Sequence, residues 1–345
     1  MDAFVRAVEW LRLLLVHVPG LAPLAAAPYL FRPLLMVLAL GAAGAVVGVL
    51  VNLRCAEFHA EALVHAVFPG IVVGAVYRGI EAIIPAAAVA GVAAAAVLTA
   101  VSHRSRREAS EAGTAVVLTS FFSIGLIILL AKGDMSGQLE ALMFGRLLEV
   151  TDARLAQALI VCAVALLLIM ATWKEQVAYA FDRTGARASG LRLLALDLVL
   201  NTAIAAAVVS ASTAVGTLLV IGYLVIPGAT ARILVSRVRS MVAVAIAVGV
   251  GGGYLGMLLM TLPETLDKPI SPQATVALVM TAILLLAVGV AAARERLRRV
   301  VRQARSARPA PAATTVSSGA DTGVASDEAA GAEGAVAPTA EGSRA

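Results

Sequence analysis

The stretch LVLNTAIAAAVVSASTAVGTLLVIGYLVIPGATA, residues 198–231, contains no charged residue. An α-helix rises about 1.5 Å per residue and the hydrocarbon core of a bilayer is about 30 Å thick, so one helix over the whole stretch would be too long for a single crossing. The polar and β-branched segment Ser210–Thr213 lies near the middle of the stretch. We therefore expect two membrane-spanning helices here, divided at Ser210–Thr213.

The composition of the whole chain extends this interpretation. Of its 345 residues, 60% are hydrophobic and only 14% are charged, whereas a soluble domain is about a quarter charged. The sequence therefore predicts an all-α, polytopic membrane protein with about nine transmembrane helices. The expected spans are residues 34–53, 62–77, 82–102, 112–131, 155–173, 192–210, 214–231, 241–262 and 272–293.

Arginine clusters predict the orientation of these spans. The segments SHRSRREAS (102–110), VSRVRS (235–240) and RERLRRVVRQARSAR (294–308) lie between or after apolar runs. Because basic loops stay in the cytoplasm, we expect these segments and the 174–191 loop to be cytoplasmic, and 132–154 and 263–271 to face outside. The net charge of +5 thus reflects membrane topology and does not indicate nucleic-acid binding.

Three regions follow from this pattern. Residues 1–30 carry Arg6, Glu9, Arg12 and His17 among apolar residues, which is typical of an interfacial amphipathic helix. Residues 31–293 form the transmembrane domain. Residues 294–345 begin as a basic segment and continue as an Ala-, Gly-, Ser- and acid-rich tail, which we expect to be disordered because it cannot bury enough apolar surface.

The segment EFHAEALVHAVFPG, Glu57–Gly70, concentrates acids and histidines at the edge of the second span. Glu61 and His65 are four residues apart, so on a helix they share one face and can meet the same ion. Glu57 extends that face by one turn if the helix begins early enough, and His59 lies on another face as a weaker candidate. A carboxylate with an imidazole suits Zn, Mn or Fe.

A structural interpretation of the same pattern stays open at this point. Glu61 and His65 could pair with each other or with Arg54 near the membrane surface. Ionisable groups inside a span, however, usually face the interior of a helix bundle or a transport pathway. The following Pro69-Gly70 indicates a broken helix that lines a cavity. We treat the remaining histidines, His17 and His103, as non-ligands.

From about residue 34 to residue 293 the chain resembles the permease subunits of ABC-type metal importers, the ABC-3 family of zinc, manganese and iron uptake systems. Four segments carry the resemblance in the order of the family. They are VNLRCAEFHAEALVHAVFPG (51–70), LEALMFGRLLEVT (139–151), AFDRTGARASGL (180–191) and VGTLLVIGYLVIPGATARIL (215–234).

The resemblance implies a type II importer-like permease in a bacterial cell membrane, with two copies forming one pathway. Cytoplasmic ABC ATPase subunits would drive transport and an extracytoplasmic metal-binding protein would deliver the ion. Glu61 and His65 would contact the metal transiently, and no cofactor would be bound permanently. The segment 177–190 would dock into the ATPase, through Ala180, Asp182, Gly185, Ala188 and Gly190.

Small residues in the 177–190 segment support this docking role independently, because small side chains permit close approach of a short helix to another protein. Two departures from the family pattern stand out. Arg146 replaces the acid that is common in the outer segment, where a positive charge would repel a cation unless it pairs with Glu140 or Glu149 or faces the delivery protein. Gly228 replaces the usual Ala of the IPAATA motif, which we expect only to loosen that helix slightly.

Two other functional classes compete with the importer. The chain has no GxxxxGK[ST] phosphate-binding motif, so its energy must come from a partner ATPase or from an ion gradient, as in a secondary transporter. No internal repeat supports the gradient-driven class, and Asp197 is the only acid inside a span. A membrane metalloprotease would need HExxH, which is absent. We therefore expect a transport subunit that is not itself an enzyme, with zinc as the first expected metal, ahead of manganese or iron.

The two cysteines, Cys55 and Cys162, have no CxxC partner. They indicate neither a disulfide nor a structural zinc site.

Overall fold

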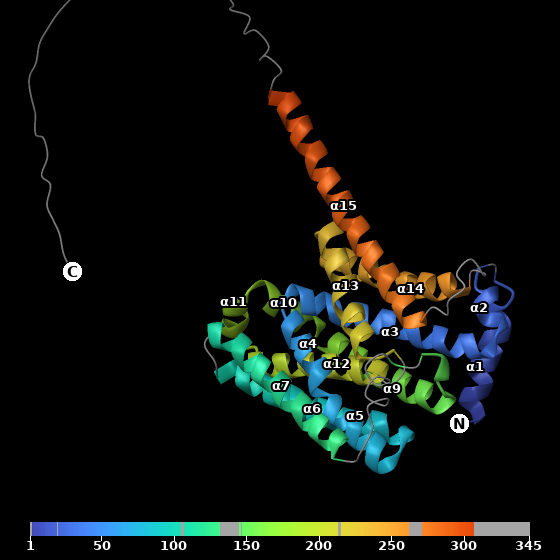
Figure 1. The fold of residues 1–345 in the computed structure, drawn as a ribbon. Coiled ribbons are helices and arrows are strands. Elements are labelled where there is room, and N and C mark those ends of the chain that lie inside the picture. Colours follow the sequence, from blue (N-terminus) through green and yellow to red (C-terminus); the bar gives the residue numbers. More distant parts are fainter. Residues whose placement is uncertain are drawn as a thin grey trace, which may run out of the picture. The chain divides into compact units, whose positions relative to one another are not determined.

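The computed structural model describes residues 2–18, 20–104, 107–131, 145, 147–212, 215–261 and 271–306. The chain divides into two units, Met1–Leu297 and Arg298–Ala345, and the first contains the helix bundle (Figure 1). The helices within the described residues are α1 (Asp2–Leu15), α2 (Ala22–Ala26), α3 (Pro28–Leu53), α4 (Glu57–Ala66), α5 (Phe68–Val73), η1 (Gly74–Arg78), η2 (Ile80–Ala82), α6 (Ile83–Arg104), α7 (Arg107–Leu130), η3 (Leu147–Glu149), α9 (Asp152–Ala171), α10 (Trp173–Phe181), α11 (Arg183–Ala188), α12 (Leu193–Ser212), α13 (Thr217–Leu234), α14 (Val238–Thr261) and α15 (Pro272–Ser306). The described residues contain no strand, as the all-α prediction requires.

Each of the nine expected spans coincides with a helical segment. Among the described residues, eight helical segments are long and apolar enough to cross a membrane, and a shorter apolar helix lies within α13. The expected division of the uncharged stretch is also present, because α12 ends at Ser212 and α13 begins at Thr217. Gly216 precedes α13 with φ of 80°, a left-handed conformation that glycine adopts at little cost.

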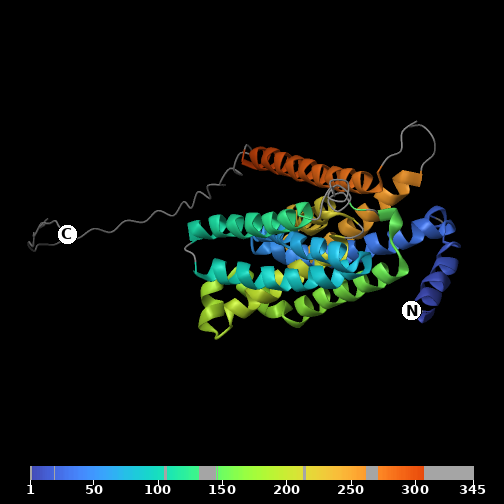
Figure 2. The ribbon, with the colours of Figure 1, turned by 60° about the horizontal axis from the view of Figure 1, so that its bottom comes forward.

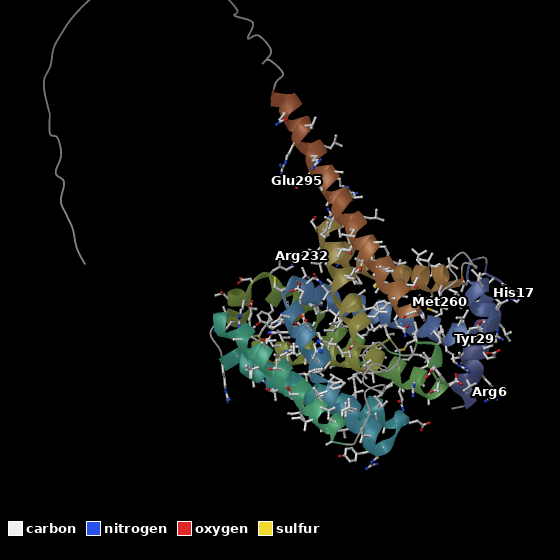
Figure 3. All side chains as sticks on the ribbon, in the orientation of Figure 1. Arg6, His17, Tyr29, Arg232, Met260 and Glu295 are labelled. Carbon is white, nitrogen blue, oxygen red and sulfur yellow. The ribbon has the colours of Figure 1, made fainter. Side chains whose placement is uncertain are left out.

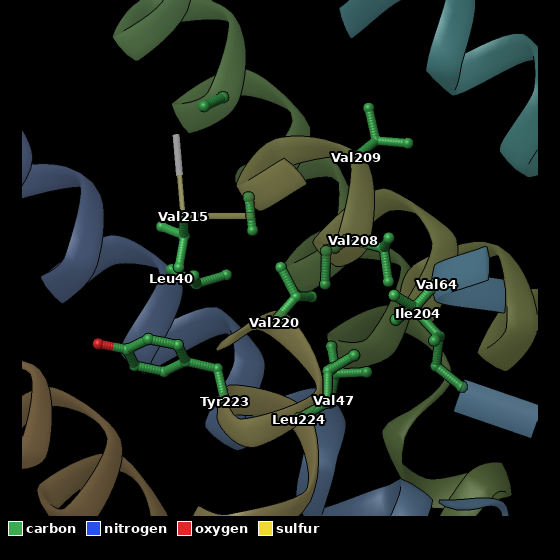
Figure 4. Packing of buried hydrophobic residues seen from close by; sticks show 14 of the residues in the cluster. Leu40, Val47, Val64, Ile204, Val208, Val209, Val215, Val220, Tyr223 and Leu224 are labelled. Atoms are coloured by element: carbon green, nitrogen blue, oxygen red, sulfur yellow. The ribbon is translucent and has the colours of Figure 1, made fainter. Parts of the chain in front are cut away.

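The α3 helix lies at the centre of the bundle and packs against α13, α14, α9 and α12. Figure 4 shows part of this core, where Leu40 and Val47 of α3 meet Tyr223 and Leu224 of α13. The helices approach so closely that a Cβ on Gly48 would lie 2.1 Å from the carbonyl oxygen of Leu224. Small residues at such contacts are the usual means by which membrane helices pack without a hydrophobic driving force.

Gly228 has a packing role that sequence reasoning missed. A Cβ at this position would lie 2.5 Å from the carbonyl oxygen of Gly48 and 2.5 Å from Nδ2 of Asn52. Asn52 donates from that nitrogen to the carbonyls of Gly48 and Val225, at 3.0 and 3.3 Å, and so ties α3 to α13. The expectation that Gly228 merely loosens its helix was therefore wrong, since glycine is what lets α13 reach α3 here.

The N-terminal segment forms α1 and α2 at the end of the bundle where α3 begins (Figure 2). In both ribbon views α1 lies across the direction of α3. At about 1.5 Å per residue, its 14 residues are too few for a crossing. Arg12 joins Glu9 and donates to the carbonyl of Ala25 at 3.1 Å, while Trp10 stays 66% exposed. This is the geometry expected of an interfacial helix, whose position in the membrane surface stays a prediction.

The C-terminal helix α15 begins where the last span was predicted and continues as a helix into the basic segment. Near its start, Val276 and Met280 pack against Gly256 and Gly252 of α14. The predictions for Lys132, Glu140 and Arg146, for most of the 263–271 loop and for the tail after residue 306 fall outside the described residues.

The close approach of α13 to α3 gives the first testable prediction. Gly228→Ala places a methyl group against backbone, which we expect to destabilise the fold by about 1–3 kcal/mol, as overpacking does in other cores. A lower thermal unfolding midpoint of the purified protein in detergent would show it. Gly251→Ala is the control, because a Cβ there meets nothing within 4 Å and alanine favours helix. Equal midpoints for the two variants would contradict the packing role.

Candidate functional site

The predicted acid and histidine face exists on α4. The helix begins at Glu57, so Glu57, Glu61 and His65 follow one another at intervals of four residues along one face. Glu61 is exposed, whereas Glu57 and His65 are half-buried. The His65 ring meets the ring of Phe122 on α7 edge to face, with centroids 5.7 Å apart. Within the described part of the chain, the carboxylates of Glu57 and Glu61 make no ion pair or side-chain hydrogen bond.

The helix is broken directly after this face, as Pro69-Gly70 predicted. The α4 helix ends at Ala66, α5 spans Phe68–Val73, and a π-helical turn follows over Gly74–Arg78. Gly70 of α5 lies so close to α6 that a Cβ would be 2.6 Å from the carbonyl oxygen of Ala86. The second span is therefore an interrupted helix, held between α6 and α7, that carries its ionisable groups before the interruption.

His59 points away from this face. Its Nε2 lies 3.4 Å from the hydroxyl of Ser102 on α6. It also lines a cavity of about 160 Å³ together with Cys55, His103 and Asp197. The structure therefore brings together Glu57, Glu61 and His65, and it places His59 in a separate polar region.

That polar region centres on Arg54, the residue after α3. We call its members the Arg54 cluster: Arg54, His103, Gln176, Tyr179 and Asp197. Arg54 pairs with Asp197 Oδ1, donates to Gln176 Oε1 at 2.7 Å, and stacks 3.9 Å above the centre of the Tyr179 ring. Asp197 Oδ2 lies 2.6 Å from His103 Nε2 and accepts from the Tyr179 hydroxyl at 3.2 Å. The alternative pairing of Arg54 with Glu61 or His65 is therefore not formed.

The cluster also contains Asp197, the only acid inside a predicted span. Asp197 lies in the second turn of α12, beside the ends of α3 and α6, and it has three side-chain partners. Burial and the negative charge of Asp197 raise the pKa of Tyr179. The phenol therefore keeps its proton at neutral pH and remains a donor to the carboxylate.

The predicted coupling segment forms two short helices, α10 and α11, at the end of the bundle opposite α1 (Figure 1). Asp182 caps α11 by accepting from the Gly185 amide at 2.9 Å, and a Cβ on Gly185 would collide with that carboxylate. Gly190 has φ of 81°, which ends the segment in a left-handed turn. Three of the five predicted coupling residues, Asp182, Gly185 and Gly190, thus shape the segment.

The surface of this segment comes from other residues. Phe181 is 71% exposed, and Thr184 and Ala188 are exposed beside it, whereas Ala180 is half-buried. Ala186 faces inward and packs on Tyr179. Sequence reasoning missed Phe181, although a large aromatic residue in a predicted cytoplasmic loop is a signal of a contact surface.

The remaining histidines and cysteines take no part in the α4 face. His17 lies beside α1, far from α4 in Figure 3, and its Nδ1 is 3.0 Å from the carbonyl of Leu13. Cys162 is buried beside Ser210, and Cys55 is exposed, so the two thiols are unpaired as expected. The described residues of a single chain contain no group of three or more His, Cys, Asp and Glu that could hold a metal ion.

The sequence profile of the ABC 3 transport family matches residues 26–291. The chain belongs to this family. It is 34% identical, over 206 residues covering 58% of this chain and 68% of the relative, to the chelated iron transport system membrane protein YfeC of Yersinia pestis. It is 29% identical, over 66% of this chain and 80% of the relative, to the manganese transport system membrane protein MntC of Listeria monocytogenes.

A solved structure shares the fold. PsaBC from Streptococcus pneumoniae, determined in complex with Fab, superimposes with a TM-score of 0.67 over 78% of this chain and 94% of that chain, at 24% sequence identity. With the apolar helices described above, family membership makes this chain a multi-pass bacterial membrane protein of the ABC-3 permease type.

Proposed function

We propose that the chain is the membrane-spanning subunit of an ATP-driven importer for divalent transition-metal ions. Membership of the ABC 3 transport family supports the transporter class, and relatives named for manganese and chelated iron support the kind of cargo. The absence of a phosphate-binding motif from the sequence requires that a separate subunit hydrolyse the ATP.

The main support for the proposal is that Glu57, Glu61 and His65 are ionisable groups in a helix long and apolar enough to cross a membrane, and that the two carboxylates have no partner among the described residues. Leaving such groups against lipid is unfavourable, so they need an aqueous lumen or a second protein surface. A polar pathway next to this face of α4 satisfies that need.

Two copies of the chain would complete the ion site. One carboxylate and one imidazole per copy are too few to hold a metal, and no larger ligand group exists within the described part of one chain. A two-fold axis near α4 would bring Glu61 and His65 together with the same pair from the other copy, giving four ligands. A site divided between two subunits can also open by their separation, which suits a transport site that must release its ion.

The proposed ligand atoms limit the kinds of metal ion that can bind, but they do not select a single metal. Imidazole with carboxylate serves zinc, manganese and iron. The donor chemistry placed zinc first, whereas the names of the relatives favour manganese or iron. We therefore propose manganese or iron as the cargo, with zinc as the competitor to test against them.

Removal of the proposed ligands gives the main test. We expect Glu61→Gln and His65→Asn to lower manganese or iron uptake by more than the about 10- to 100-fold that loss of a second-shell partner costs at metal sites. Uptake of the radioactive ion by cells that depend on this transporter would measure it, with unlabelled zinc as competitor. The control is Glu81→Gln, an exposed acid in η2 away from α4.

Near-normal uptake in both ligand variants would contradict the assignment of the α4 face. Loss of uptake in the control as well would point to a general effect of removing charge.

We also propose that α10 and α11 dock into the ATPase subunit. Phe181 protrudes from a segment that is capped and ended by rigid turns, as a contact helix requires. The predicted cytoplasmic side of this segment supports the same partner, and the extracytoplasmic metal-binding protein would then act at the opposite end.

This docking surface makes a separate prediction. We expect Phe181→Asp to abolish co-purification of the ATPase subunit encoded with this permease, because it replaces an exposed apolar contact by a charge. Arg239→Ala, at an exposed position in the first turn of α14, is the control on the same predicted side. Equal recovery of the ATPase with both variants would exclude Phe181 from the interface.

A further inference from the structure

We propose that the Arg54 cluster is a coupling joint, through which movement of α10 and α11 is transmitted to the ion-contacting face of α4. The inference rests on the proposed function, because it assigns the path between the proposed ATPase contact and the proposed ion site. Arg54 and Asp197 act in it as positioning residues and do not touch the ion.

The first step in the path runs from α10 to Arg54. Gln176 and Tyr179 both belong to α10, and together they hold the Arg54 side chain from two directions. Gln176 is fully buried, and its Nε2 donates to the carbonyl of Leu196 at 2.8 Å. The planar guanidinium offers several donors in fixed directions, so it can serve a carboxylate, an amide and an aromatic ring at once.

The second step runs from Arg54 to α4. Only Cys55 and Ala56 separate Arg54 from Glu57, the first residue of α4. This link is tight, because Cys55 adopts a left-handed φ of 51° and the Ala56 amide donates back to the carbonyl of Val51 at 2.9 Å. A short, closed link transmits a displacement of Arg54 to the first turn of α4, which carries Glu57 and leads to Glu61.

Asp197 fixes the joint to the rest of the bundle. It pairs with Arg54 through one oxygen, and through the other it contacts His103 of α6 and Tyr179 of α10. The side chains of Arg54 and Asp197 are only 9% and 18% exposed, so separating them would leave charges in a poorly hydrated place. The pair should therefore hold one of a few discrete arrangements and resist gradual distortion.

An ion pair at the other end of α3 provides a comparison within the same chain. Arg32 binds Asp152 through two contacts of 2.6 and 2.9 Å, and it joins α3 to the start of α9. The chemistry is the same, but within the described residues this pair makes no hydrogen bond or ion pair to α10, α11 or α4. Its loss should weaken packing without affecting the joint.

Hydrogen exchange of the full chain in lipid nanodiscs tests whether α10 restrains the start of α4 through Arg54. Tyr179→Ala keeps every charge but removes the ring beneath Arg54. We expect it to speed exchange of the backbone amides at residues 54–60 about tenfold, because their hydrogen bonds open locally when the contact of Tyr179 with Arg54 is lost. Asp152→Asn should leave these amides unchanged. Faster exchange confined to α10 and α11 in the Tyr179 variant would overturn the proposal.

Transport by the assembled complex in proteoliposomes tests the coupling. We expect Asp197→Asn to reduce metal ions imported per ATP hydrolysed about tenfold, within the usual range of coupling between two sites, while hydrolysis continues. Asp197→Glu, which keeps the charge, should restore much of the ratio, and Asp152→Asn should leave it unchanged. An unchanged ratio for Asp197→Asn, or the same drop for Asp152→Asn, would contradict the joint.

The two experiments separate the two proposals. A wild-type complex that imports no metal with ATP would refute the proposed function, whereas the exchange experiment needs no transport and still decides whether α10 holds the start of α4. Where Asp197→Asn fails to fold, Tyr179→Ala is carried through both experiments in its place.

Discussion

The structure depends on one electrostatic constraint: an ionisable group within an apolar helix bundle needs a partner or water. Arg54 and Asp197, which are separated by 143 residues, satisfy this constraint through each other, and in doing so they fix the ends of α3, α6, α10 and α12 together. Arg32 and Asp152 do the same between α3 and α9. The close helix contacts around α3, made at glycines, then leave little freedom for α13 and α14.

The same constraint separates groups that hold the fold together from those that serve transport. Glu57, Glu61 and His65 lie in a helical segment long and apolar enough to cross a membrane, yet the two carboxylates have no partner among the described residues. Arg54 and Asp197 are paired with each other, whereas the two carboxylates at the start of this interrupted helix are not paired within the described residues. In our account the α4 face is completed by a second copy and by the ion, and the Arg54 cluster links it to the segment that meets the ATPase.

Much of this architecture was predictable from the sequence, because long uncharged runs and arginine clusters report directly on membrane helices. The α4 face was predictable too, since a spacing of four residues survives in any helix that includes Glu57. The partner of Asp197 was not, because a contact across 143 residues depends on packing that no local pattern encodes. The role of Gly228 was not predictable for the same reason, because it depends on the close contact of this glycine with Gly48 and Asn52 of α3.

The water accessibility of position 61 tests most directly whether the α4 face lines an aqueous pathway. With Cys55→Ser removing the exposed native thiol, Glu61→Cys should react with a charged, membrane-impermeant thiol reagent. Leu167→Cys, 68% exposed on the apolar surface of α9, should not react. A thiol at position 61 as unreactive as the one at position 167 would show that this face meets lipid, and would contradict the account.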